Sequence, residues 1–465
     1  MSKLSIGVDR ADARPAFRQI ADRVREAVAA GLLAPGDRLP AARVLAAQLG
    51  LARGTVDTAY ALLAGEGFIE GRGAAGTIVS PLLSPAPPPP LSEPAALPEI
   101  GQVTGALPFR MGLPALDAFP RTLWSRLTAR TVRRGGVAEL AYPDPAGLPE
   151  LRESIAAYLR VARGIACTPE QIIVTAGFQG ALALAATLLQ PGDPVWVEDP
   201  GYFLAHEAMR VAGARLAPVP VDSTGLDVAA GIAMEPAARL AVVTPTHQAT
   251  LGVALSLPRR LALLDWAARH GGWILEDDYD SEFRYTGRPL PALKSLDRAD
   301  RVLYAGSFSK VLFPALRLGY LVPPAALHAP LVTASRVLLG GLPALEQRIV
   351  AGFMHEGHFA RHIRRMRSLY ASRRAALARA LAAAFGDRLT LTLQAGGMHL
   401  LARLADAPPD REMVARAQAA GLAPSPVSAM SLRERAGDGL LLGFTNVAEA
   451  AAPALAARLA AAIGG

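Results

Sequence analysis

A proline-rich segment divides the chain and limits how it can fold. Residues 81–98 read PLLSPAPPPPLSEPAALP, with four consecutive prolines at 87–90. Proline lacks a backbone N–H and has a fixed φ, so such a stretch is excluded from the interior of a helix or sheet and favours extended polyproline geometry. We predict a linker over residues 81–105, a small domain over 12–80 and a large domain over 106–465. A loop packed along one domain is the alternative.

Composition excludes several classes of protein. The 465 residues exceed one ordinary core, and 51% hydrophobic with 19% charged residues is typical of a folded, soluble chain. The longest apolar stretch, 172–189, is interrupted by Thr175, Gln179 and Thr187, so we expect no membrane span. Charged residues near the N-terminus argue against a secretory signal, and we expect a cytoplasmic protein. A single cysteine excludes an intrachain disulfide and a cysteine-based metal cluster, and we expect no metal site.

The first part of the chain has the pattern of a winged helix-turn-helix. Apolar residues recur at helical spacing from Phe17 to Val28, and shorter helices are expected over 41–49 and 53–63. The strand-like runs 68–70 and 77–79 flank the glycine-rich string GRGAAG, which predicts a β-hairpin. The net charge of +8 is compatible with a nucleic-acid partner.

Beyond residue 106 the pattern predicts an α/β fold. Apolar strand-like runs alternate with helical segments such as 257–270, which is typical of a mostly parallel sheet covered by helices on both faces. The runs are 172–174, 195–197, 240–243, 273–275 and 302–304. Residues from about 365 onward, with strands expected at 391–393 and 440–442, predict a smaller α/β subdomain.

One lysine is notable because nearly every basic residue of this chain is an arginine. Only three of the 48 basic residues are lysines, and Lys310 lies in the string GSFSKVLFPALRLGY. A lysine amine forms Schiff bases with aldehydes, and the neighbouring Ser307, Ser309 and Arg317 suit a phosphate dianion. An aldehyde and a phosphate on one small molecule describe pyridoxal 5′-phosphate (PLP). A surface lysine in a polar loop is the alternative.

Three other strings follow predicted strands and complement this hypothesis. In ILEDDYDSEFRY, Asp277 is the candidate that pairs with a pyridine nitrogen, and Tyr279 then reaches the phenolic oxygen of the cofactor; an acidic Mg²⁺ loop is the alternative. In VTAGFQGALALAATLL, the backbone N–H groups of Gly177, Phe178 and Gln179 would form an anion site at a helix N-terminus. In VEDPGYFLAH, Tyr202 could stack on the cofactor ring, with ordinary packing as the alternative.

Together these strings resemble the fold-type-I aminotransferase family. The resemblance runs from FRMGLPALDAFP (109–120) to LLLGFTN (440–446) and includes AYPDPAGLPELR (141–152). It implies a large PLP-binding domain with a small C-terminal subdomain, in which Lys310 forms the Schiff base. It also implies roles for the residues already named: Asp277 as pyridine partner, Tyr279 as phenol-oxygen donor, Tyr202 as stacking aromatic, and Ser307, Ser309, Arg317 and the 177–179 turn as phosphate ligands. Tyr142 would reach the phosphate of a neighbouring subunit.

Residues 17–79 resemble a GntR-type DNA-binding domain. That resemblance implies that the helix led by Arg53, Thr55 and Val56 enters the major groove. Arg43 would contact bases or phosphate, and the wing tip, Gly73 to Gly76, would approach the minor groove. The family's usual serines after Pro40 are replaced by Ala41 and Ala42, which leaves affinity more dependent on arginine. A winged helix used only for protein contacts is the alternative.

The combination of a GntR-like head and an aminotransferase-like body resembles the MocR family of transcription regulators. The strings TPTHQ (244–248) and HFARHIRRMR (358–367) support this resemblance. It implies a homodimer that binds double-stranded operator DNA and senses PLP or an amino compound, with control of vitamin B6 or amino-compound metabolism as one role. We expect a regulator that retains the PLP site and not an enzyme. The alternative is a PLP-dependent aminotransferase with an accessory N-terminal domain.

Two positions depart from the aminotransferase pattern. The family's R-x-[SG]-[FY] arginine, which clamps a substrate α-carboxylate, corresponds to Leu441. Its loss makes a general amino-acid transaminase doubtful, although another arginine could take its place. In HQATLG (247–252), Thr250 replaces a proline, which puts in question the local turn and any role of His247 or Gln248.

Overall fold

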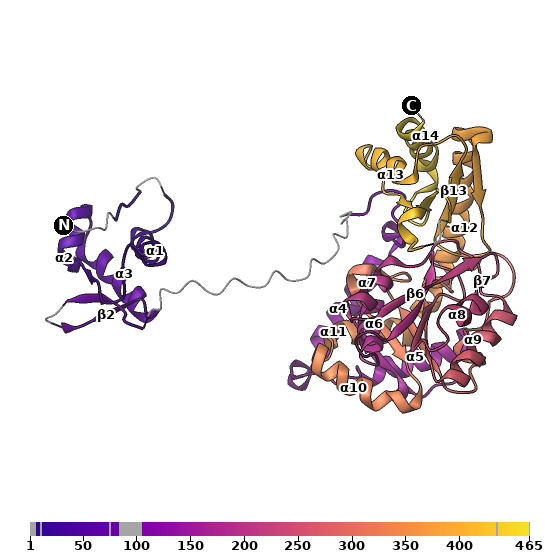
Figure 1. The fold of residues 1–465 in the computed structure, drawn as a ribbon, viewed down its shortest axis with the longest axis horizontal. Coiled ribbons are helices and arrows are strands. Elements are labelled where there is room, and N and C mark those ends of the chain that lie inside the picture. Colours follow the sequence, from indigo (N-terminus) through magenta and orange to yellow (C-terminus); the bar gives the residue numbers. More distant parts are fainter. Residues whose placement is uncertain (1–5, 10–11, 74–75, 83–104, 434–435, 465) are drawn as a thin grey trace. The chain divides into compact units, whose positions relative to one another are not determined.

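The computed structural model describes residues 6–9, 12–73, 76–82, 105–433 and 436–464. The chain forms two compact units, Met1–Gly101 and Gln102–Gly465, which are described separately (Figure 1). Most of the predicted linker, residues 83–104, lies outside the described residues, so its conformation stays a prediction.

The first unit is a winged helix-turn-helix, as predicted. Its helices are α1 (Ala16–Ala29), α2 (Ala42–Leu49) and α3 (Arg53–Gly65), and its strands are β1 (Arg38–Leu39), β2 (Ile69–Gly71) and β3 (Thr77–Val79). The strands form an antiparallel sheet in the order β1-β3-β2, in which β1 was not predicted. Ile20, Val24 and Leu63 are fully buried between the helices and the sheet. Gly50, in the left-handed region with φ 62°, ends α2 and opens the turn to α3.

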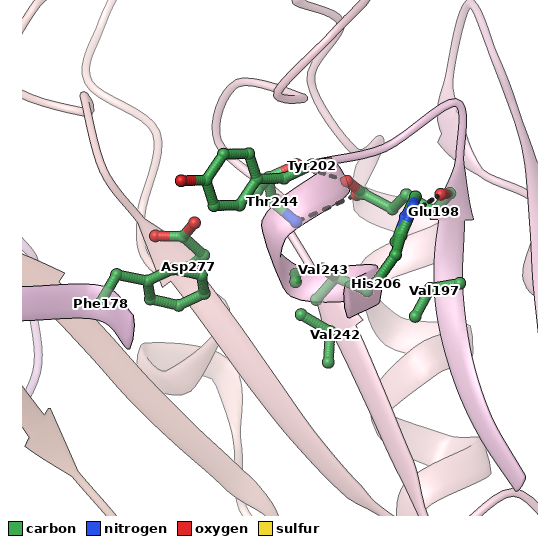
Figure 2. A pocket seen from close by; sticks show the side chains of 10 residues that line it. Phe178, Val197, Glu198, Tyr202, His206, Val242, Val243, Thr244 and Asp277 are labelled. Carbon is green, nitrogen blue, oxygen red and sulfur yellow. Dashed lines mark hydrogen bonds between the residues drawn. The ribbon is translucent and has the colours of Figure 1, made fainter. Parts of the chain in front are cut away.

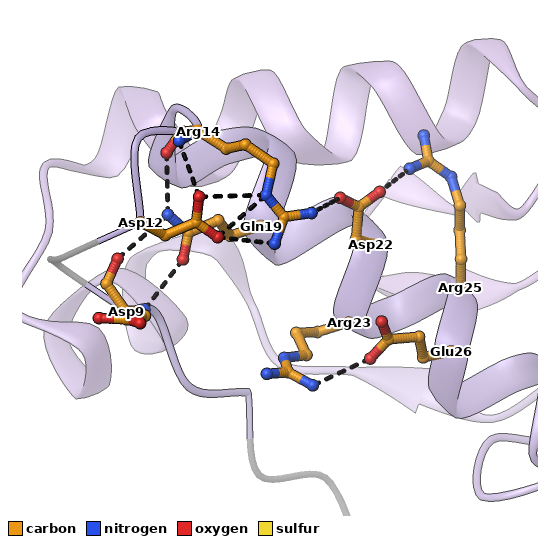
Figure 3. Close-up of polar contacts among 8 residues, drawn as sticks. All are labelled: Asp9, Asp12, Arg14, Gln19, Asp22, Arg23, Arg25 and Glu26. Atoms are coloured by element: carbon orange, nitrogen blue, oxygen red, sulfur yellow. Dashed lines mark hydrogen bonds and ion pairs between the residues drawn. The ribbon is translucent and has the colours of Figure 1, made fainter. Parts of the chain in front are cut away.

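A polar cluster ties the segment before α1 to that helix (Figure 3). The buried amide of Gln19 accepts from the N–H of Asp9 at 2.9 Å and donates to the carbonyl oxygens of Asp9 and Arg14 at 3.1 and 2.8 Å. The exposed guanidinium of Arg14 contacts Asp12 and Asp22 at 2.6 and 3.1 Å. Because exposed ion pairs contribute little to stability, the buried amide accounts for most of this attachment.

The second unit contains the predicted, largely parallel sheet. In spatial order its strands are β4 (Ile173–Thr175), β11 (Gly319–Val322), β10 (Val302–Ser307), β9 (Trp273–Asp278), β8 (Leu240–Val243), β5 (Pro194–Asp199), β6 (Arg215–Asp222) and β7 (Gly225–Leu226). Strands β10, β9, β8, β5 and β6 are parallel. β11 is antiparallel to both of its neighbours, and β7 is antiparallel to β6. β4 therefore runs in the same direction as β10.

Apolar side chains cover both faces of this sheet, as expected for parallel strands. Adjacent residues of one strand enter different clusters: Val195 and Val197 pack in one, and Trp196 packs in the other against Trp266 of α9. The helices before the small subdomain are α4 (Arg121–Arg134), α5 (Pro149–Ala162), α6 (Gly177–Ala186), α7 (Phe203–Val211), α8 (Val228–Met234), α9 (Leu257–His270), α10 (Ala325–Leu339) and α11 (Ala344–His355). The predicted helix over 257–270 is α9.

The C-terminal subdomain is built on a four-stranded antiparallel sheet. Its elements are α12 (His358–Phe385), β12 (Leu389–Thr392), β13 (His399–Leu404), α13 (Asp410–Ala419), β14 (Ser425–Pro426), β15 (Leu440–Gly443) and α14 (Ala452–Ile463), and the strand order is β12-β13-β15-β14. Leu440 and Leu442 join the cluster that includes Leu377 of α12 and Leu459 of α14. Leu441 faces the opposite side of the sheet, because successive strand residues alternate.

Candidate cofactor site and DNA-binding unit

The predicted cofactor residues gather at one edge of the large sheet. β4, β5, β9 and β10 all point in the same direction, so their carboxyl ends share an edge. Gly177 follows β4, Tyr202 follows β5, Asp277 and Tyr279 lie at the end of β9, and Lys310 follows β10. Ligands of open α/β sheets bind at this edge. Strand order therefore brings together strings that are more than 100 residues apart in the sequence.

Lys310 is held by a glycine that sequence reasoning did not single out. Its Nζ donates to the carbonyl oxygen of Gly112 at 3.0 Å. Gly112 has φ +69°, which favours glycine, and a Cβ at this position would lie 2.4 Å from the lysine Nζ, so any other residue would displace the amine from this position. Burial lowers the pKa of Lys310, against the opposing effect of Asp277 and Asp280. A lowered pKa favours the neutral amine, which is the form that attacks an aldehyde.

Asp277 is the middle of three consecutive acids on β9. Glu276 accepts from the backbone N–H groups of Leu293 and Lys294 at 2.7 and 2.8 Å. Asp278 is engaged by the guanidinium of Arg163 and the hydroxyl of Tyr304, both at 2.6 Å. Asp277 instead lines a pocket.

The pocket brings Asp277 together with aromatic side chains (Figure 2). The ring of Tyr202 and the carboxylate of Asp277 point into the same space, with Phe178 beside them. Burial raises the pKa of Asp277 well above its usual value, and the neighbouring Asp278 adds to the effect. A protonated ring nitrogen would supply the missing countercharge. Gln179 Nε2 donates to the Tyr202 hydroxyl at 3.3 Å, and burial raises the pKa of that hydroxyl to about 12.

A second group of residues forms a site with the chemistry of an anion cradle. Arg317 lies at the N-terminal end of α6, where its guanidinium donates to the carbonyl oxygen of Ala176 at 3.2 Å and contacts the Gln179 side chain. Register pairs Gly319 with both Thr175 and Ser307, which brings the ends of β4 and β10 together. Ser307 Oγ accepts from the N–H of Ser309 at 3.2 Å. A guanidinium, two hydroxyls and a helix N-terminus suit a phosphate dianion.

The turn that contains Thr250 is held by a glutamine. Gln248 Oε1 accepts from the N–H groups of Thr250 and Leu251 at 3.0 and 2.6 Å, and its Nε2 donates to the carbonyl oxygen of Pro200 at 2.7 Å. Gln248 is 1% exposed. These bonds order the turn without the proline, and they link it to the loop that carries Tyr202.

Leu441 belongs to an apolar cluster next to the Lys310 loop. It is paired in register with Leu401, both are buried, and they pack with Met111 and Leu251. Met111 immediately precedes Gly112, the partner of Lys310. The position of the expected carboxylate clamp is therefore occupied by a buried apolar side chain.

Tyr142 is 98% exposed in the single chain. Its contact with a neighbouring subunit's phosphate stays a prediction.

The DNA-binding candidates of the head differ in accessibility. Arg43 on α2 is exposed, and the Arg53 side chain at the start of α3 is 70% exposed, with its Nε 3.3 Å from Asp57. Thr55 is half-buried. The expectation that Val56 contacts bases is wrong: Val56 is 0% exposed, because α3 turns it into the core together with Ala59, Tyr60 and Leu63.

The wing has the geometry that its glycines allow. Gly73 and Gly76 have φ of 53° and 87° and are exposed. The Arg72 N–H donates to the Gly76 carbonyl oxygen at 2.8 Å, which closes the turn. Residues 74–75 lie outside the described part of the chain.

Comparison with known proteins matches both units. Residues 16–79 match the bacterial regulatory proteins of the gntR family, and residues 128–436 match aminotransferase class I and II. A protein of Rhizobium meliloti named probable rhizopine catabolism regulatory protein MocR is 38% identical over 458 residues, which is 95% of this chain and 92% of that protein. The chain is a MocR-type regulator.

Other similar proteins agree with this assignment. The MocR-type chain is 35% identical over 399 residues to the pyridoxine biosynthesis regulator PdxR of Corynebacterium glutamicum, covering 84% of each. The solved α-aminoadipate aminotransferase of Thermus thermophilus, complexed with N-(5′-phosphopyridoxyl)-L-leucine, superimposes with a TM-score of 0.70 at 30% identity, covering 77% of this chain and 92% of that one. These similarities confirm two predictions, that the chain is a transcription regulator and that PLP is the cofactor of this fold. Within the described residues, no helix has the length and apolar character needed to cross a bilayer.

Proposed function

We propose that this MocR-type regulator binds PLP through Lys310 and couples the state of that site to operator binding by its head. One observation carries the proposal: a lysine amine with a lowered pKa, a buried carboxylate and an anion cradle meet at the carboxyl edge of one sheet. Bound PLP supplies an aldehyde that condenses with a lysine amine and a ring that withdraws electrons.

The roles of the surrounding side chains follow from their chemistry. Asp277 holds a proton on the ring nitrogen, Tyr279 donates to the phenolic oxygen, and the face of Tyr202 packs on the ring. The phosphate is bound by the hydroxyls of Ser307 and Ser309, the guanidinium of Arg317, and the backbone N–H groups of Gly177, Phe178 and Gln179. In a homodimer, Tyr142 of one subunit contacts the phosphate held by the other.

The apolar position 441 points to the kind of effector. Leu441 is fully buried, so position 441 supplies no guanidinium for a two-pronged contact with a carboxylate, and loss of such a contact weakens carboxylate binding by several kcal/mol. We therefore propose as effector PLP itself or an amino compound that is bound without a carboxylate clamp at this position. Control of vitamin B6 or amino-compound metabolism follows from such a ligand.

For the head we propose major-groove contacts by Arg53 and Thr55, phosphate or base contacts by Arg43, and minor-groove approach by the Gly73–Gly76 wing. No side chain caps α2 or α3 at Ala41 and Ala52, so their first N–H groups are available to DNA phosphates. A homodimer would read two half-sites. Such a regulator works in the cytoplasm.

The test is a footprint and a binding titration on operator DNA with the cofactor-free and PLP-loaded protein, repeated with Lys310→Ala. We expect PLP to change operator affinity or the footprint of the native chain, and to leave the variant unchanged. Because coupling is reciprocal, operator DNA must change PLP affinity by the same factor. Identical affinity and footprint with and without PLP would refute sensing.

An aminotransferase is the second candidate, favoured by the reactive setting of Lys310. Steady turnover of an amino donor and a 2-oxo acid, with no operator binding by the full chain, would support it. Leu441 and the exposed arginines of the head argue against it.

A further inference from the structure

His247 lies beside the tyrosine that is proposed to contact the cofactor. Its Nδ1 is 2.8 Å from the Tyr279 hydroxyl oxygen and 3.0 Å from Oδ2 of Asp280. The side chains of His247 and Asp280 are 7% and 2% exposed. The ring of His399 packs against that of His247 with centroids 5.5 Å apart. Two buried polar groups therefore converge on Nδ1 of His247, and a second imidazole packs against its ring.

Asp280 determines which ring nitrogen of His247 carries the proton. An ionised carboxylate only accepts hydrogen bonds, and an unprotonated Nδ1 held 3.0 Å from it would place two acceptors against each other. Nδ1 is therefore assigned the proton. Nε2 and Asp280 Oδ2 are both buried with no hydrogen-bond partner among the described residues, so the Nδ1–H is directed at the Tyr279 oxygen and contacts the carboxylate only through its charge. A buried lone pair is tolerated better than a buried N–H, which supports the same tautomer.

Backbone packing holds the ring in this orientation. Gly397 and Gly252 have φ of +97° and +70°, and a Cβ on either would lie 2.4 or 2.9 Å from Nε2. The edge of the imidazole thus lies directly against two glycines, so rotation of the ring is restricted. His399 Nε2 donates to the carbonyl oxygen of Thr250, 3.2 Å away, which holds the second ring in turn.

The tautomer decides where the single proton of the Tyr279 hydroxyl points. If Nδ1 accepted from Tyr279, the hydroxyl proton would be engaged in the hydrogen bond to His247. With Nδ1–H as the donor, the tyrosine oxygen accepts, and its own proton is available to a second acceptor, which is Asp280 in the absence of PLP and the phenolic oxygen when PLP is bound. Donation into the oxygen also polarises the hydroxyl and makes it a better donor.

We propose that His247, oriented by Asp280, is a positioning residue that directs the Tyr279 proton toward the phenolic oxygen of PLP. The proposal rests on the proposed binding of PLP at Lys310, and it assigns His247 no contact with the cofactor.

The other charged groups around Tyr279 keep its hydroxyl protonated. Burial raises the pKa of Tyr279 well above its usual value, followed by the effects of Asp280, Asp277 and Glu198. Burial lowers the pKa of His399 to about 3, so this ring stays neutral near neutral pH. Arg110 and Arg317 lower the pKa of Lys310 further, against the opposing effect of Asp277 and Asp280.

The test measures the pH midpoint of the absorbance change of PLP bound to the full-length protein. A hydrogen bond to the phenolic oxygen stabilises its negative charge and weakens its hold on the Schiff-base proton. Loss of the directing N–H in His247→Phe should therefore raise the midpoint, by about half a pH unit for a bond acting through Tyr279. His247→Asn keeps an N–H donor and should retain a midpoint close to that of the native chain.

Three further variants distinguish a positioning role of His247 from a general disturbance of the site. Tyr279→Phe should raise the midpoint more than His247→Phe, and adding His247→Phe to Tyr279→Phe should cause no further shift. His399→Phe changes the neighbouring ring without removing the His247 contact and should leave the midpoint unchanged. Additive shifts in the double variant, or an unchanged midpoint in His247→Phe, would overturn the proposal. If borohydride traps no adduct at Lys310 of the native chain, the proposed PLP site fails instead.

Discussion

Substituting Gly112 with alanine tests whether this residue positions the lysine amine. The added Cβ would lie 2.4 Å from Lys310 Nζ, whereas ordinary van der Waals contacts begin near 3.4 Å, so the amine must move by about 1 Å. A displacement of that size can slow a reaction by up to about a hundredfold, and we expect a ten- to hundredfold slower attachment of PLP. Stopped-flow absorbance after mixing with PLP measures this rate.

The chain offers a matched control for the backbone contribution. Gly271, which ends α9, has φ +72° against +69° for Gly112, and a Cβ there would meet no atom within 4 Å. Alanine at either position costs roughly 1 kcal/mol of unfolding free energy from left-handed strain. Gly271→Ala should lose this stability and attach PLP at the native rate. If Gly112→Ala also attached PLP at the native rate, the assigned positioning role would be refuted.

Three further predictions concern other parts of the molecule. Glu282 is partly buried and accepts from the Tyr158 hydroxyl at 2.6 Å, and its loss of solvation raises its pKa from 4.5 to about 7. The folded state therefore keeps a proton that the unfolded state releases, so the free energy of unfolding should fall by roughly 3 kcal/mol for this group as pH rises from 4.5 to 7. Urea unfolding of Glu282→Gln across this pH range should show a weaker pH dependence of that free energy. An unchanged pH dependence would contradict the reasoning. Ornithine carries a carboxylate that putrescine lacks, so putrescine should perturb the absorbance of PLP bound to the native chain more strongly than ornithine does. In Leu441→Arg, ornithine should compete with putrescine. A native preference for ornithine would contradict the loss of the carboxylate clamp. Arg53→Ala should weaken operator binding and reduce the dependence of operator affinity on salt. Val56→Ala should lower the melting temperature of the head without changing which bases are preferred. A changed base preference in Val56→Ala would argue against the burial of Val56.

The local sequence pattern was sufficient to predict the main helices and strands, but not the direction in which every side chain points. Continuous apolar runs located strands β4, β5, β8, β9 and β10, because burial on both faces of a sheet leaves a strong apolar signal, and helical periodicity located α9; strands β6 and β7 were not predicted. The choice of Asp277 among adjacent acids agrees with its place in the pocket, although only the structure shows Arg163 beneath Asp278. Val56 was misassigned because a helix that enters DNA must also bury one face in its own domain.

Long-range contacts explain what the sequence did not reveal. Gly112 contacts a residue 198 positions away, and His247 reaches Tyr279 across 32 positions. No periodicity encodes such pairs. The signals available were weaker: a glycine inside FRMGLP, and a histidine inside HQATLG whose role was left open.

The alternation along β9 has a consequence for how this site can evolve. Glu276 and Asp278 are committed to backbone amides and to Arg163, and Asp277 alone is left for the pocket. Inserting or deleting one residue upstream in this strand would exchange these assignments, burying Asp277 against the arginine side and presenting a different acid to the ligand. Point substitutions along the strand are tolerable one at a time, but a change in its length would relocate every charge at once. Descendants of this chain should therefore accept substitutions in β9 far more readily than insertions or deletions of residues.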